Sequence, residues 1–415
     1  MRIEVLAVGD ELLLGATQDS NSGFAAREMF ASGLQLSQVT VVGDAEPELC
    51  AGLEAALARC QALIVTGGLG PTVDDRTKEV VAAALGDELV LDPVILEEIR
   101  GRFARRGRPM PEINVKQAMM PRGARVIPNP VGSAPGVHWS RDGREVFLLP
   151  GVPAEMRAMF SATVLPCLLE VANPQPACFA AFRTVGVPES ELAERISGVT
   201  NAFPDAVWAF YPGWGGVDVK VRRAGAADAA WTALCTQLRA AAGTACYSES
   251  AAESLAEVVQ KLLVARGMTV AFAESCTGGL VGARFTEVAG ASACFTGAFV
   301  TYANAAKMQW LGVPEELLRD EGAVSAACAA AMARGARARA TSDIAVSVTG
   351  LAGPAGGTPE KPVGLVFVAL AAASGCWTRR LQLFQNRELN RYVASQMALD
   401  LVRRHLLGWP VGDPT

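Results

Sequence analysis

The chain contains only two histidines among its 415 residues, His138 and His405, and none of its ten cysteines belongs to a Cys-x-x-Cys pair. A Cys/His zinc site is therefore not expected, and any metal would have to be held by carboxylates. Most of the cysteines lie in apolar surroundings, as Cys60 and Cys328 do. Reduced, buried thiols of this kind are typical of a cytoplasmic protein.

The sequence also lacks long runs of one chemical character. No segment reaches the ~18 unbroken apolar residues of a membrane span. The N-terminal run 1–6 places the acid Glu4 inside an apolar stretch, which is not the pattern of a signal peptide. There is no long basic run, and the formal net charge is −5. These features argue against a nucleic acid or a membrane as a partner.

Length and composition favour a globular chain with several cores. Hydrophobic residues make up 51% and charged residues 19% of the sequence. The 41 glycines and 23 prolines gather at the ends of apolar runs, where α/β enzymes keep their loops. We predict an α/β protein with domains at residues 1–170, 171–249 and 250–415, the middle one being a small α+β module.

The first segment alternates apolar strands with helical stretches. Strands are predicted at 3–8, 38–42 and 62–66, and helices at 21–31, 48–59 and 78–85. This alternation indicates a mostly parallel sheet with helices on both faces. Ligands of such sheets bind beyond the carboxyl ends of the strands, so the loops after Val8, Val42 and Val65 are the ones to examine.

The loop after the third predicted strand has the composition of a phosphate site. Three glycines let backbone N–H groups approach a phosphate, and two threonines add donors. The expected phosphate-binding residues here are Thr66, Gly67, Gly68, Gly70 and Thr72. Asp74 and Asp75 follow and could hold a hard divalent cation. Alternatively, these two acids only cap the next helix.

Further acids and glycine-proline loops are expected at the same edge. Asp10 and Asp44 end the other two strands, although Asp10 is equally suited to cap a helix. Two rigid loops at 129–136 and 149–156 would add walls, with Glu155 near a helix that Pro153 opens. The predicted metal ligands are Asp10, Asp44, Asp74, Asp75 and Glu155, and the further phosphate-binding residues are Asn129, Gly132 and Gly151.

Together, the three loops resemble a known domain. Thr-Gly-Gly-Leu-Gly-Pro-Thr-x-Asp-Asp-x-Thr, Asn-Pro-x-Gly-x-Ala-Pro-Gly and Leu-Pro-Gly-Val-Pro-x-Glu-Met are similar to the molybdopterin-binding-type domain of the CinA (competence/damage-inducible) proteins. That resemblance implies a three-layer α/β fold and a pyrophosphatase that needs a divalent metal (Mg²⁺, Mn²⁺ or Co²⁺) and converts ADP-ribose to AMP and ribose 5-phosphate. The middle segment resembles the same family's KH-like domain.

A KH label suggests RNA, because KH domains clamp the nucleic-acid backbone with a Gly-x-x-Gly loop. Here Gly213-Trp214-Gly215-Gly216 lies between two predicted strands rather than two helices. A hairpin turn is therefore the better interpretation. We interpret the module as a spacer or a dimer element.

The third segment contains a strand at 268–272 that breaks into Ala273-Glu274-Ser275-Cys276-Thr277-Gly278-Gly279 before a helix. Small hydroxyls and free N–H groups at a helix N-terminus suit an anion, an oxyanion or a serine nucleophile. The alternative is that Ser275 or Thr277 merely caps the helix.

Other residues supply possible partners for Ser275. Tyr302 and Lys307 stand where a strand at 298–302 passes into a helix, and a glycine-rich loop follows a strand at 343–349. A serine and a lysine without a nearby histidine suggest a serine–lysine amidohydrolase, since a desolvated lysine can deprotonate the hydroxyl. Individually, Lys307 could be a surface charge and Tyr302 a core aromatic.

The motifs Ala-Glu-Ser-Cys-Thr-Gly-Gly, Thr-Tyr-x-Asn-x-x-Lys and Ser-x-Thr-Gly-x-Ala-Gly-Pro-x-Gly-Gly resemble the nicotinamide mononucleotide deamidase domain of CinA proteins. The resemblance implies Ser275 as nucleophile and Lys307 as base, supported by Tyr302 and Thr277, with no cofactor. It also implies that the nucleotide is bound by Gly278, Gly279, Thr349, Gly350, Gly353, Gly356, Gly357 and Arg387.

The chain departs from this family pattern at two places. Asn386 stands where the family's last motif has glycine, and Pro188 replaces a glycine in the middle segment. The resemblance implies a bifunctional, homodimeric enzyme of pyridine-nucleotide salvage that acts on nicotinamide mononucleotide and ADP-ribose. The alternative is a molybdopterin-binding or DNA-uptake accessory protein whose first domain holds a ligand without turnover.

Overall fold

Strand β1 (Ile3–Val8) is buried along its whole length inside a six-stranded sheet. Ile3 and Val5 pack into one hydrophobic cluster, and Leu6 and Val8 pack into another on the opposite face. Because successive side chains of a strand point to opposite faces, both faces of this sheet must be covered by helices. The first segment is thus the predicted three-layer α/β domain.

The strand order in this sheet is β2-β1-β3-β8-β7-β6. The first four strands in that order are parallel, whereas β7 and β6 are antiparallel additions at one edge. The strands after β1 are β2 (Leu36–Val42), β3 (Ala62–Thr66), β6 (Arg125–Ile127), β7 (Gly136–Arg141) and β8 (Arg144–Leu149). A separate pair is formed by β4 (Leu89–Leu91) and β5 (Met119–Pro121).

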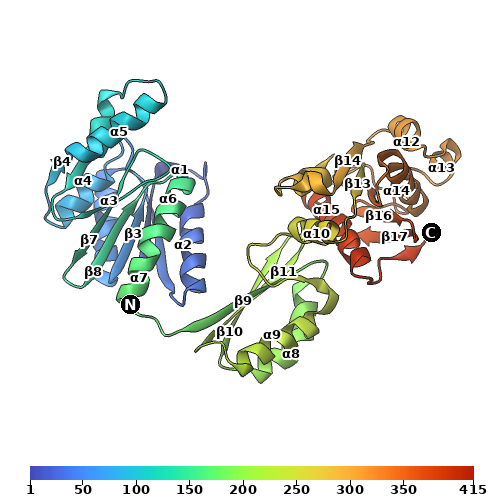
Figure 1. Cartoon of the computed structure of the whole chain (residues 1–415), viewed down its shortest axis with the longest axis horizontal. Coiled ribbons are helices and arrows are strands. Elements are labelled where there is room, and N and C mark those ends of the chain that lie inside the picture. Colours follow the sequence, from blue (N-terminus) through green and yellow to red (C-terminus); the bar gives the residue numbers. More distant parts are fainter. The chain divides into compact units, whose positions relative to one another are not determined.

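Two groups of helices form the outer layers (Figure 1). One group comprises α3 (Glu46–Arg59), α4 (Thr77–Ala84), α5 (Pro93–Arg105) and the short η1 (Glu112–Ala118). The other comprises α2 (Ser20–Ala31), α6 (Pro153–Met159), η2 (Phe160–Val164) and α7 (Leu165–Ala172). The short α1 (Asp10–Leu13) follows β1.

The computed structural model describes residues 1–415, which divide into two compact units, Met1–Ala177 and Cys178–Thr415. The second unit begins with a four-stranded sheet of order β10-β11-β9-β12. It consists of β9 (Ala177–Thr184), β10 (Ala206–Gly213), β11 (Gly216–Ala224) and β12 (Cys246–Ser248), with α8 (Glu189–Ala202), α9 (Ala229–Ala242) and η3 (Gly243–Ala245). The 213–216 run is the predicted hairpin turn.

A second six-stranded sheet follows, with order β14-β13-β15-β16-β17-β18. Its β13 (Val270–Glu274), β14 (Phe295–Val300) and β15 (Ile344–Gly350) are parallel, and β16 (Leu365–Ala372), β17 (Gly375–Gln382) and β18 (Asp413–Pro414) continue antiparallel. The helices are α10 (Leu255–Ala265), α11 (Leu280–Thr286), η4 (Ala291–Ala293), α12 (Asn304–Leu311), α13 (Glu315–Asp320), α14 (Ala326–Ala340) and α15 (Arg387–Leu406).

A buried ion pair within α15, between Arg403 and Asp400, is linked to the four-stranded sheet through hydrogen bonds of Arg403. Arg403 on α15 binds Asp400 and donates to the carbonyl oxygens of Thr244 and Cys246 beside the four-stranded sheet. Since removing one member leaves the other charged and buried, such a pair holds its surroundings together. This contact ties α15 to residues 244–246 within the unit of residues 178–415, which contains two of the predicted domains.

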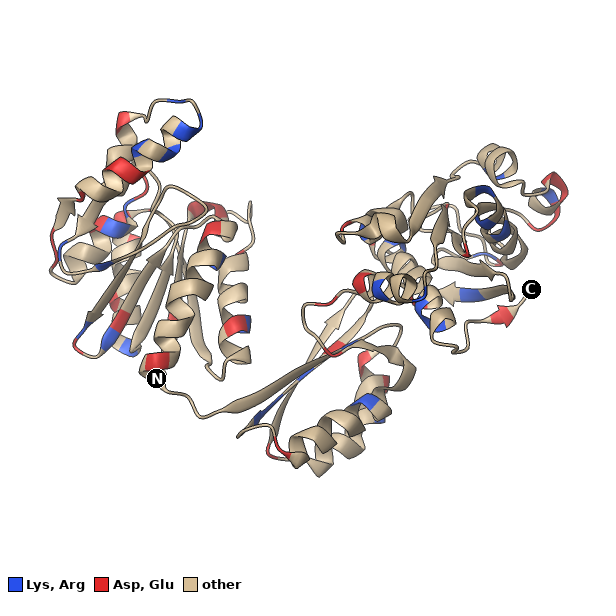
Figure 2. Cartoon of the chain, in the orientation of Figure 1, with Lys and Arg blue, Asp and Glu red and all other residues tan.

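Charge is spread over both units, with acidic residues among the basic ones (Figure 2). None of the helices is both long enough and apolar enough to cross a membrane.

Candidate active sites

Ser275 lies directly after β13, in the loop that leads to α11. Its backbone N–H donates to the carbonyl oxygen of Val348 at 2.9 Å, and the N–H of Thr301 donates to that of Glu274 at 2.8 Å. These bonds continue the pairing of three parallel strands to their carboxyl ends. The loops after β13, β14 and β15 therefore meet at one edge of the sheet.

The side chain of Lys307, on α12, reaches this edge. Its Nζ lies 3.0 Å from Ser275 Oγ, 2.8 Å from the carbonyl oxygen of Thr301 and 3.1 Å from that of Tyr302. Lys307 is 1% exposed and forms no ion pair with a carboxylate. Burial lowers the pKa of Lys307 below its ordinary value, because the charged form loses its hydration.

These three contacts suit a lysine that takes up a proton. A neutral amine has two N–H bonds and one lone pair, whereas the ammonium has three N–H bonds. The two carbonyl oxygens can only accept, so they take the two N–H bonds. The lone pair of the neutral amine then faces Ser275 Oγ. The structure thus brings together the two side chains that the sequence paired as nucleophile and base.

Glu274 occupies the helix N-terminus at which the sequence predicted an anion. Its buried carboxylate accepts hydrogen bonds from the N–H groups of Gly279, Val281 and Gly282 at 2.9 to 3.1 Å. The N–H of Gly278 is also used, by the carbonyl oxygen of Ser275. The expectation that Gly278 and Gly279 offer free donors to a nucleotide is therefore wrong, because an internal carboxylate and carbonyl already accept from them.

The donors that remain near Ser275 belong to the next two residues. The N–H groups of Cys276 and Thr277 have no acceptor on another residue. The Thr277 side chain is fully buried and its Oγ1 also has no partner. Burial raises the pKa of the Cys276 thiol to about 12, so it stays protonated at neutral pH. An oxyanion formed at Ser275 would meet N–H donors here rather than a competing thiolate.

Tyr302 and Arg387 lie together at the open side of the site. The Tyr302 hydroxyl is 3.3 Å from Arg387 Nη2, and Arg387 Nη1 donates to the Gly353 carbonyl oxygen at 2.9 Å. The Tyr302 side chain is 61% exposed. The structure therefore joins the strand end, the glycine loop and the start of α15, as the sequence predicted.

The glycine loop itself is mostly held by internal contacts. The Thr349 hydroxyl donates to the Ala323 carbonyl oxygen at 2.7 Å, so it is not directed at a ligand. Gly350 has no room for a side chain, because a Cβ would lie 2.7 Å from the Leu365 carbonyl oxygen. Gly356 and Gly357 are exposed. Thr349 and Gly350 thus have structural roles that their place in the motif did not reveal.

Arg391 is a site residue that the sequence reasoning missed. Its Nε and Nη2 donate to the carbonyl oxygen of Thr277 at 3.2 and 2.9 Å, which fixes the loop behind Ser275. Arg391 lies one helical turn after Arg387 on α15. That i, i+4 spacing is the signal that could have indicated it.

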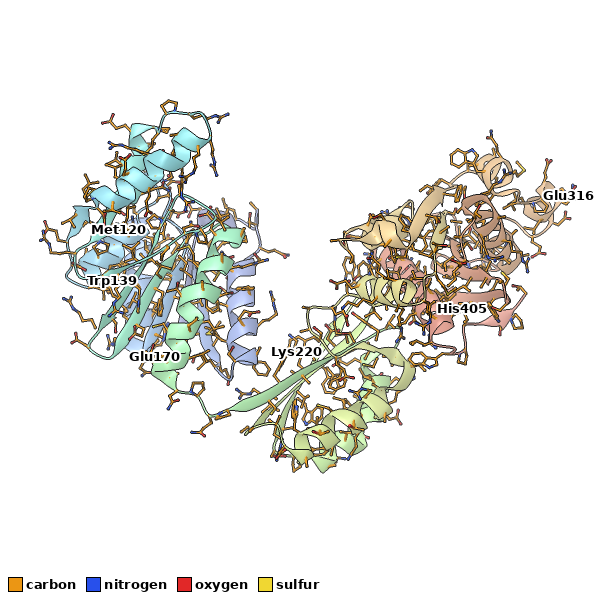
Figure 3. All side chains as sticks on the ribbon, in the orientation of Figure 1. Met120, Trp139, Glu170, Lys220, Glu316 and His405 are labelled. Carbon is orange, nitrogen blue, oxygen red and sulfur yellow. The ribbon has the colours of Figure 1, made fainter.

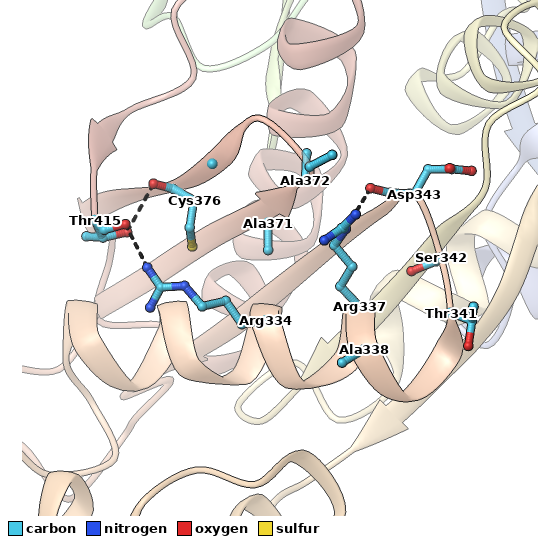
Figure 4. A pocket seen from close by; sticks show the side chains of 12 residues that line it. Arg334, Arg337, Ala338, Thr341, Ser342, Asp343, Ala371, Ala372, Cys376 and Thr415 are labelled. Carbon is cyan, nitrogen blue, oxygen red and sulfur yellow. Dashed lines mark hydrogen bonds between the residues drawn. The ribbon is translucent and has the colours of Figure 1, made fainter.

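A pocket at the other edge of the same sheet is separate from this site (Figure 4). The pocket lies beside the start of β15 at Ile344 and the end of β16 at Ala372. Arg334 and Arg337 are among the residues that line it. Both arginines donate to backbone carbonyl oxygens of their own chain. Nothing in this pocket resembles the Ser275 arrangement.

In the first unit, the acids that end β1 and β2 come together. The N–H of Asp10 donates to Asp44 Oδ2 at 2.9 Å, and the N–H of Asp44 donates to Asp10 Oδ1 at 3.1 Å. Partial burial raises the pKa of Asp44, and the neighbouring carboxylates of Asp10, Glu11 and Asp74 raise it further. This crowding of negative charge is what a cation would relieve.

Asp75 and Glu155 do not join this group. Asp75 Oδ2 accepts from the backbone and side chain of Thr72, and Glu155 Oε2 accepts from Asn129 Nδ2 at 2.6 Å. Asn129 Oδ1 in turn accepts from the N–H of Gly132. The predicted metal role of Asp75 and Glu155 and the predicted phosphate role of Thr72, Asn129 and Gly132 are not supported, because their polar groups stabilise their own loops.

Gly67 and Gly68 follow the buried Thr66 and have positive φ angles of 107° and 63°. A Cβ on Gly67 would clash with the carbonyl oxygen of Val8, and one on Gly68 would clash with Thr77. Gly151 packs against Gly67, whereas Gly70 packs against Asp75. Glycine is therefore required where the loops after β1, β3 and β8 approach one another.

Three further polar groups lie near these glycines, and the sequence reasoning did not identify them. Asn21 Nδ2 donates to the Gly151 carbonyl oxygen at 2.8 Å, but Asn21 Oδ1, Ser22 Oγ and Thr77 Oγ1 are buried without a partner. Such unsatisfied groups need an explanation, and a bound polar ligand supplies one. The polar run 19–22 at the start of α2 was the available signal.

In a comparison with known proteins, two regions of the chain each match a family model. Residues 4–170 match the probable molybdopterin binding domain, and residues 252–406 match the CinA C-terminal domain. A putative competence-damage inducible protein of Symbiobacterium thermophilum is 44% identical over 99% of this chain and 100% of its own. The chain belongs to the CinA family.

Other members of the CinA family are similar over the whole length. A CinA-like protein of Geotalea uraniireducens is 39% identical over 98% of both chains. Among solved structures, a competence/damage inducible protein of Agrobacterium tumefaciens is 40% identical, covering 38% of this chain and 99% of its own with a TM-score of 0.36. The similarity to the two full-length relatives thus extends over both regions that match family models.

Replacing Glu274 by Gln should destabilise the second unit by about 1–3 kcal/mol, because an uncharged amide binds the three N–H groups at the start of α11 less well. Urea unfolding followed by circular dichroism measures this change. Glu287→Gln, which changes an exposed residue at the end of the same helix, is the control and should have little effect. Equal effects of the two variants would contradict the role assigned to Glu274.

Proposed function

We propose that the second unit hydrolyses the carboxamide of nicotinamide mononucleotide to nicotinate mononucleotide and ammonia. The observation that carries this proposal is the 3.0 Å distance between Lys307 Nζ and Ser275 Oγ in a buried site without histidine. An amide needs a strong nucleophile, a proton acceptor and donors for the oxyanion, and all three are available at this edge. The likeness of the motifs to CinA deamidases supports the choice of substrate.

In the first half of the reaction, Ser275 Oγ attacks the amide carbon while its proton passes to the neutral Lys307. The carbonyl oxygen becomes an oxyanion that accepts hydrogen bonds from the N–H groups of Cys276 and Thr277. Lys307 then returns its proton to the amide nitrogen, the C–N bond breaks, and ammonia leaves. The product is an ester of Ser275.

In the second half, water attacks the ester. Lys307 accepts one proton of the water and passes it to Ser275 Oγ as the C–O bond breaks, which restores the serine and releases the carboxylic acid. The acid then loses its proton to solvent and becomes the carboxylate. Arg387, at the open side, is the cation we assign to the nucleotide phosphate. The exposed Tyr302 ring beside it offers an aromatic face to the positively charged pyridinium.

For the first unit, we propose hydrolysis of ADP-ribose to AMP and ribose 5-phosphate with a divalent cation. The carboxylates of Asp10 and Asp44 lie side by side, joined by two hydrogen bonds to backbone N–H groups, and Asp74 adds negative charge nearby. They offer the hard oxygen donors that Mg²⁺ or Mn²⁺ prefers, and they would hold it. Such an ion, when bound, neutralises charge on a pyrophosphate. The unpartnered atoms Asn21 Oδ1, Ser22 Oγ and Thr77 Oγ1 are available to hydrogen-bond the substrate.

A second candidate for the first unit is ligand binding without turnover. The match of residues 4–170 to a probable molybdopterin binding domain favours it. A pterin that co-purifies with the protein, together with unchanged ADP-ribose under Mg²⁺, Mn²⁺ and Co²⁺, would establish this alternative. We further propose a homodimer, for which light scattering should give twice the chain mass.

Ser275→Ala should lower ammonia release from nicotinamide mononucleotide by at least about 1000-fold, since Ser275 Oγ is the nucleophilic group within hydrogen-bond distance of Lys307 Nζ. The measurement is an ammonia assay on the purified full-length chain. Ser292→Ala, which changes an exposed serine of the same sheet region, should retain full activity. Undiminished ammonia release by Ser275→Ala would show that the nucleophile is a different group.

The deamidase rate should rise with pH and level off once Lys307 is neutral. Because burial lowers the pKa of Lys307, this plateau should begin below the ordinary pKa of lysine. Lys307→Arg should lose activity by about 100-fold or more at every pH, since a guanidinium stays charged. The profile of kcat/KM against pH measures both effects, with the exposed Lys261→Arg as control. A rate independent of pH would contradict a lysine base.

Asp44→Asn should abolish AMP formation from ADP-ribose and weaken Mn²⁺ binding, because it removes one negative charge from the acidic group. AMP is measured by chromatography, and Mn²⁺ binding by calorimetry on the same preparation. Asp142→Asn, in the exposed β7–β8 turn, is the matched control. If Asp44→Asn makes AMP at the normal rate, the cation is not held at this group.

A further inference from the structure

A second group of possible metal ligands lies at the opposite edge of the first sheet. His138 on β7 and Glu145 on β8 come from the hairpin at residues 136–149, and Cys167 comes from α7. Glu145 lies at the start of β8, which runs parallel to β3. The glycines of the predicted phosphate site follow the end of β3, so the two groups lie at opposite ends of the strands. Figure 3 labels Glu170, which lies one turn after Cys167 on α7.

The three ligand atoms converge on a small volume. His138 Nε2 lies 2.6 Å from Glu145 Oε2 and 3.9 Å from Cys167 Sγ, and all three atoms lie within 4.8 Å of one another. His138 and Glu145 are buried, and Cys167 is half-buried. In the described chain, this is the one group of three histidine, cysteine or acidic side chains that meets this spacing.

The arrangement does not suit a nucleophilic cysteine. In such a site the imidazole uses one nitrogen for the thiol and the other for the carboxylate. Here the same nitrogen, His138 Nε2, faces both Cys167 Sγ and Glu145 Oε2. A nitrogen, an oxygen and a sulfur atom that lie this close together are instead arranged as the ligands of a metal ion are.

Neighbouring side chains hold two of the ligands in place. Ser140 Oγ donates to Glu145 Oε1 at 2.8 Å, which leaves Oε2 toward His138. The His138 ring is stacked on Phe147, with 4.3 Å between centroids and 13° between planes. Such supporting contacts orient ligands in known metal sites.

The charges around the group also favour a cation. Glu145 and the exposed Glu170 both place negative charge near Cys167, whereas Arg125 on the neighbouring strand opposes them. A carboxylate and a thiolate would together balance the charge of a divalent ion, with His138 neutral.

We propose that His138, Glu145 and Cys167 bind a zinc-class divalent cation. Nitrogen, oxygen and sulfur ligands together select Zn²⁺ or Co²⁺, whereas Mg²⁺ prefers oxygen alone. Binding opens the His138–Glu145 hydrogen bond and replaces the S–H bond of Cys167 by a sulfur–metal bond, with the proton released to solvent. The ion would fasten α7, the last helix of the first unit, to the β7–β8 hairpin.

The test uses Co²⁺ as the probe on full-length protein freed of metal by a chelator, with Mg²⁺ present to occupy the acidic group at the other edge. We expect a thiolate-to-Co²⁺ charge-transfer band that Zn²⁺ abolishes and Mg²⁺ does not. Cys167→Ser should remove the band and weaken Co²⁺ binding at least about tenfold. Cys50→Ser, a half-buried thiol of the same unit, is the control and should keep the band.

A second variant, Glu145→Gln, separates loss of metal binding from loss of folding, because the glutamine can still hydrogen-bond His138 and Ser140. It should keep the unfolding temperature of the metal-free protein but lose the increase that Zn²⁺ gives the unchanged chain. A band that persists in Cys167→Ser, or a Zn²⁺-induced increase that persists in Glu145→Gln, would overturn the proposal. Absence of Co²⁺ binding below millimolar concentration would also overturn it.

Discussion

The buried amine of Lys307 is the constraint on which the second site depends. A charge that is removed from water and left without an opposite charge is costly, so the fold must either pair it or favour its neutral form. Here it is met by two carbonyl oxygens at the end of β14 and by Ser275 Oγ. The contacts of one nitrogen therefore tie together the end of β14, α12 and the loop after β13. Burial lowers the pKa of this amine toward the neutral form that the proposed amide hydrolysis would use.

The two candidate sites differ in the polar groups that they leave without a partner. In the second unit, the carboxylate of Glu274 accepts hydrogen bonds from the N–H groups at the start of α11. The positive end of that helix dipole therefore already has an internal anion beside it. In the proposed function, the nucleotide phosphate would pair instead with Arg387 at the open side. In the first unit, polar atoms of Asn21, Ser22 and Thr77 stay unpartnered beside the glycine loops. We therefore expect direct ligand contacts there.

The departures from the CinA motifs have local physical explanations. Asn386, at the position of a glycine, caps α15 by accepting a hydrogen bond from the N–H of Leu389 at 3.0 Å. An asparagine is a preferred N-cap, so Arg387 keeps its place at the first turn. Pro188 caps α8 with extended backbone angles, which a proline adopts without strain. Neither change alters the contacts of Ser275 and Lys307.

Much of the site could be predicted because the signals are local. A buried strand followed by small residues and a helix marks a strand end, and parallel strand ends meet at one edge. Reading along the chain therefore pointed to Ser275, Lys307, Asp10 and Asp44 as candidates that lie near one another. The same local reading assigned Gly279, Asp75 and Glu155 to ligands. It could not show that their polar groups bind within the protein.

The sequence by itself indicated the α/β class, and it pointed to Ser275 and Lys307 as partners, whose side chains lie 3.0 Å apart in the structure. Only the tertiary structure decided which polar groups are already satisfied and which distant side chains meet. Arg391 contacts Thr277 across 114 residues, and Cys167 meets His138 across 29. No periodicity encodes such contacts, because they depend on how helices dock on the sheet rather than on the backbone conformation of either segment.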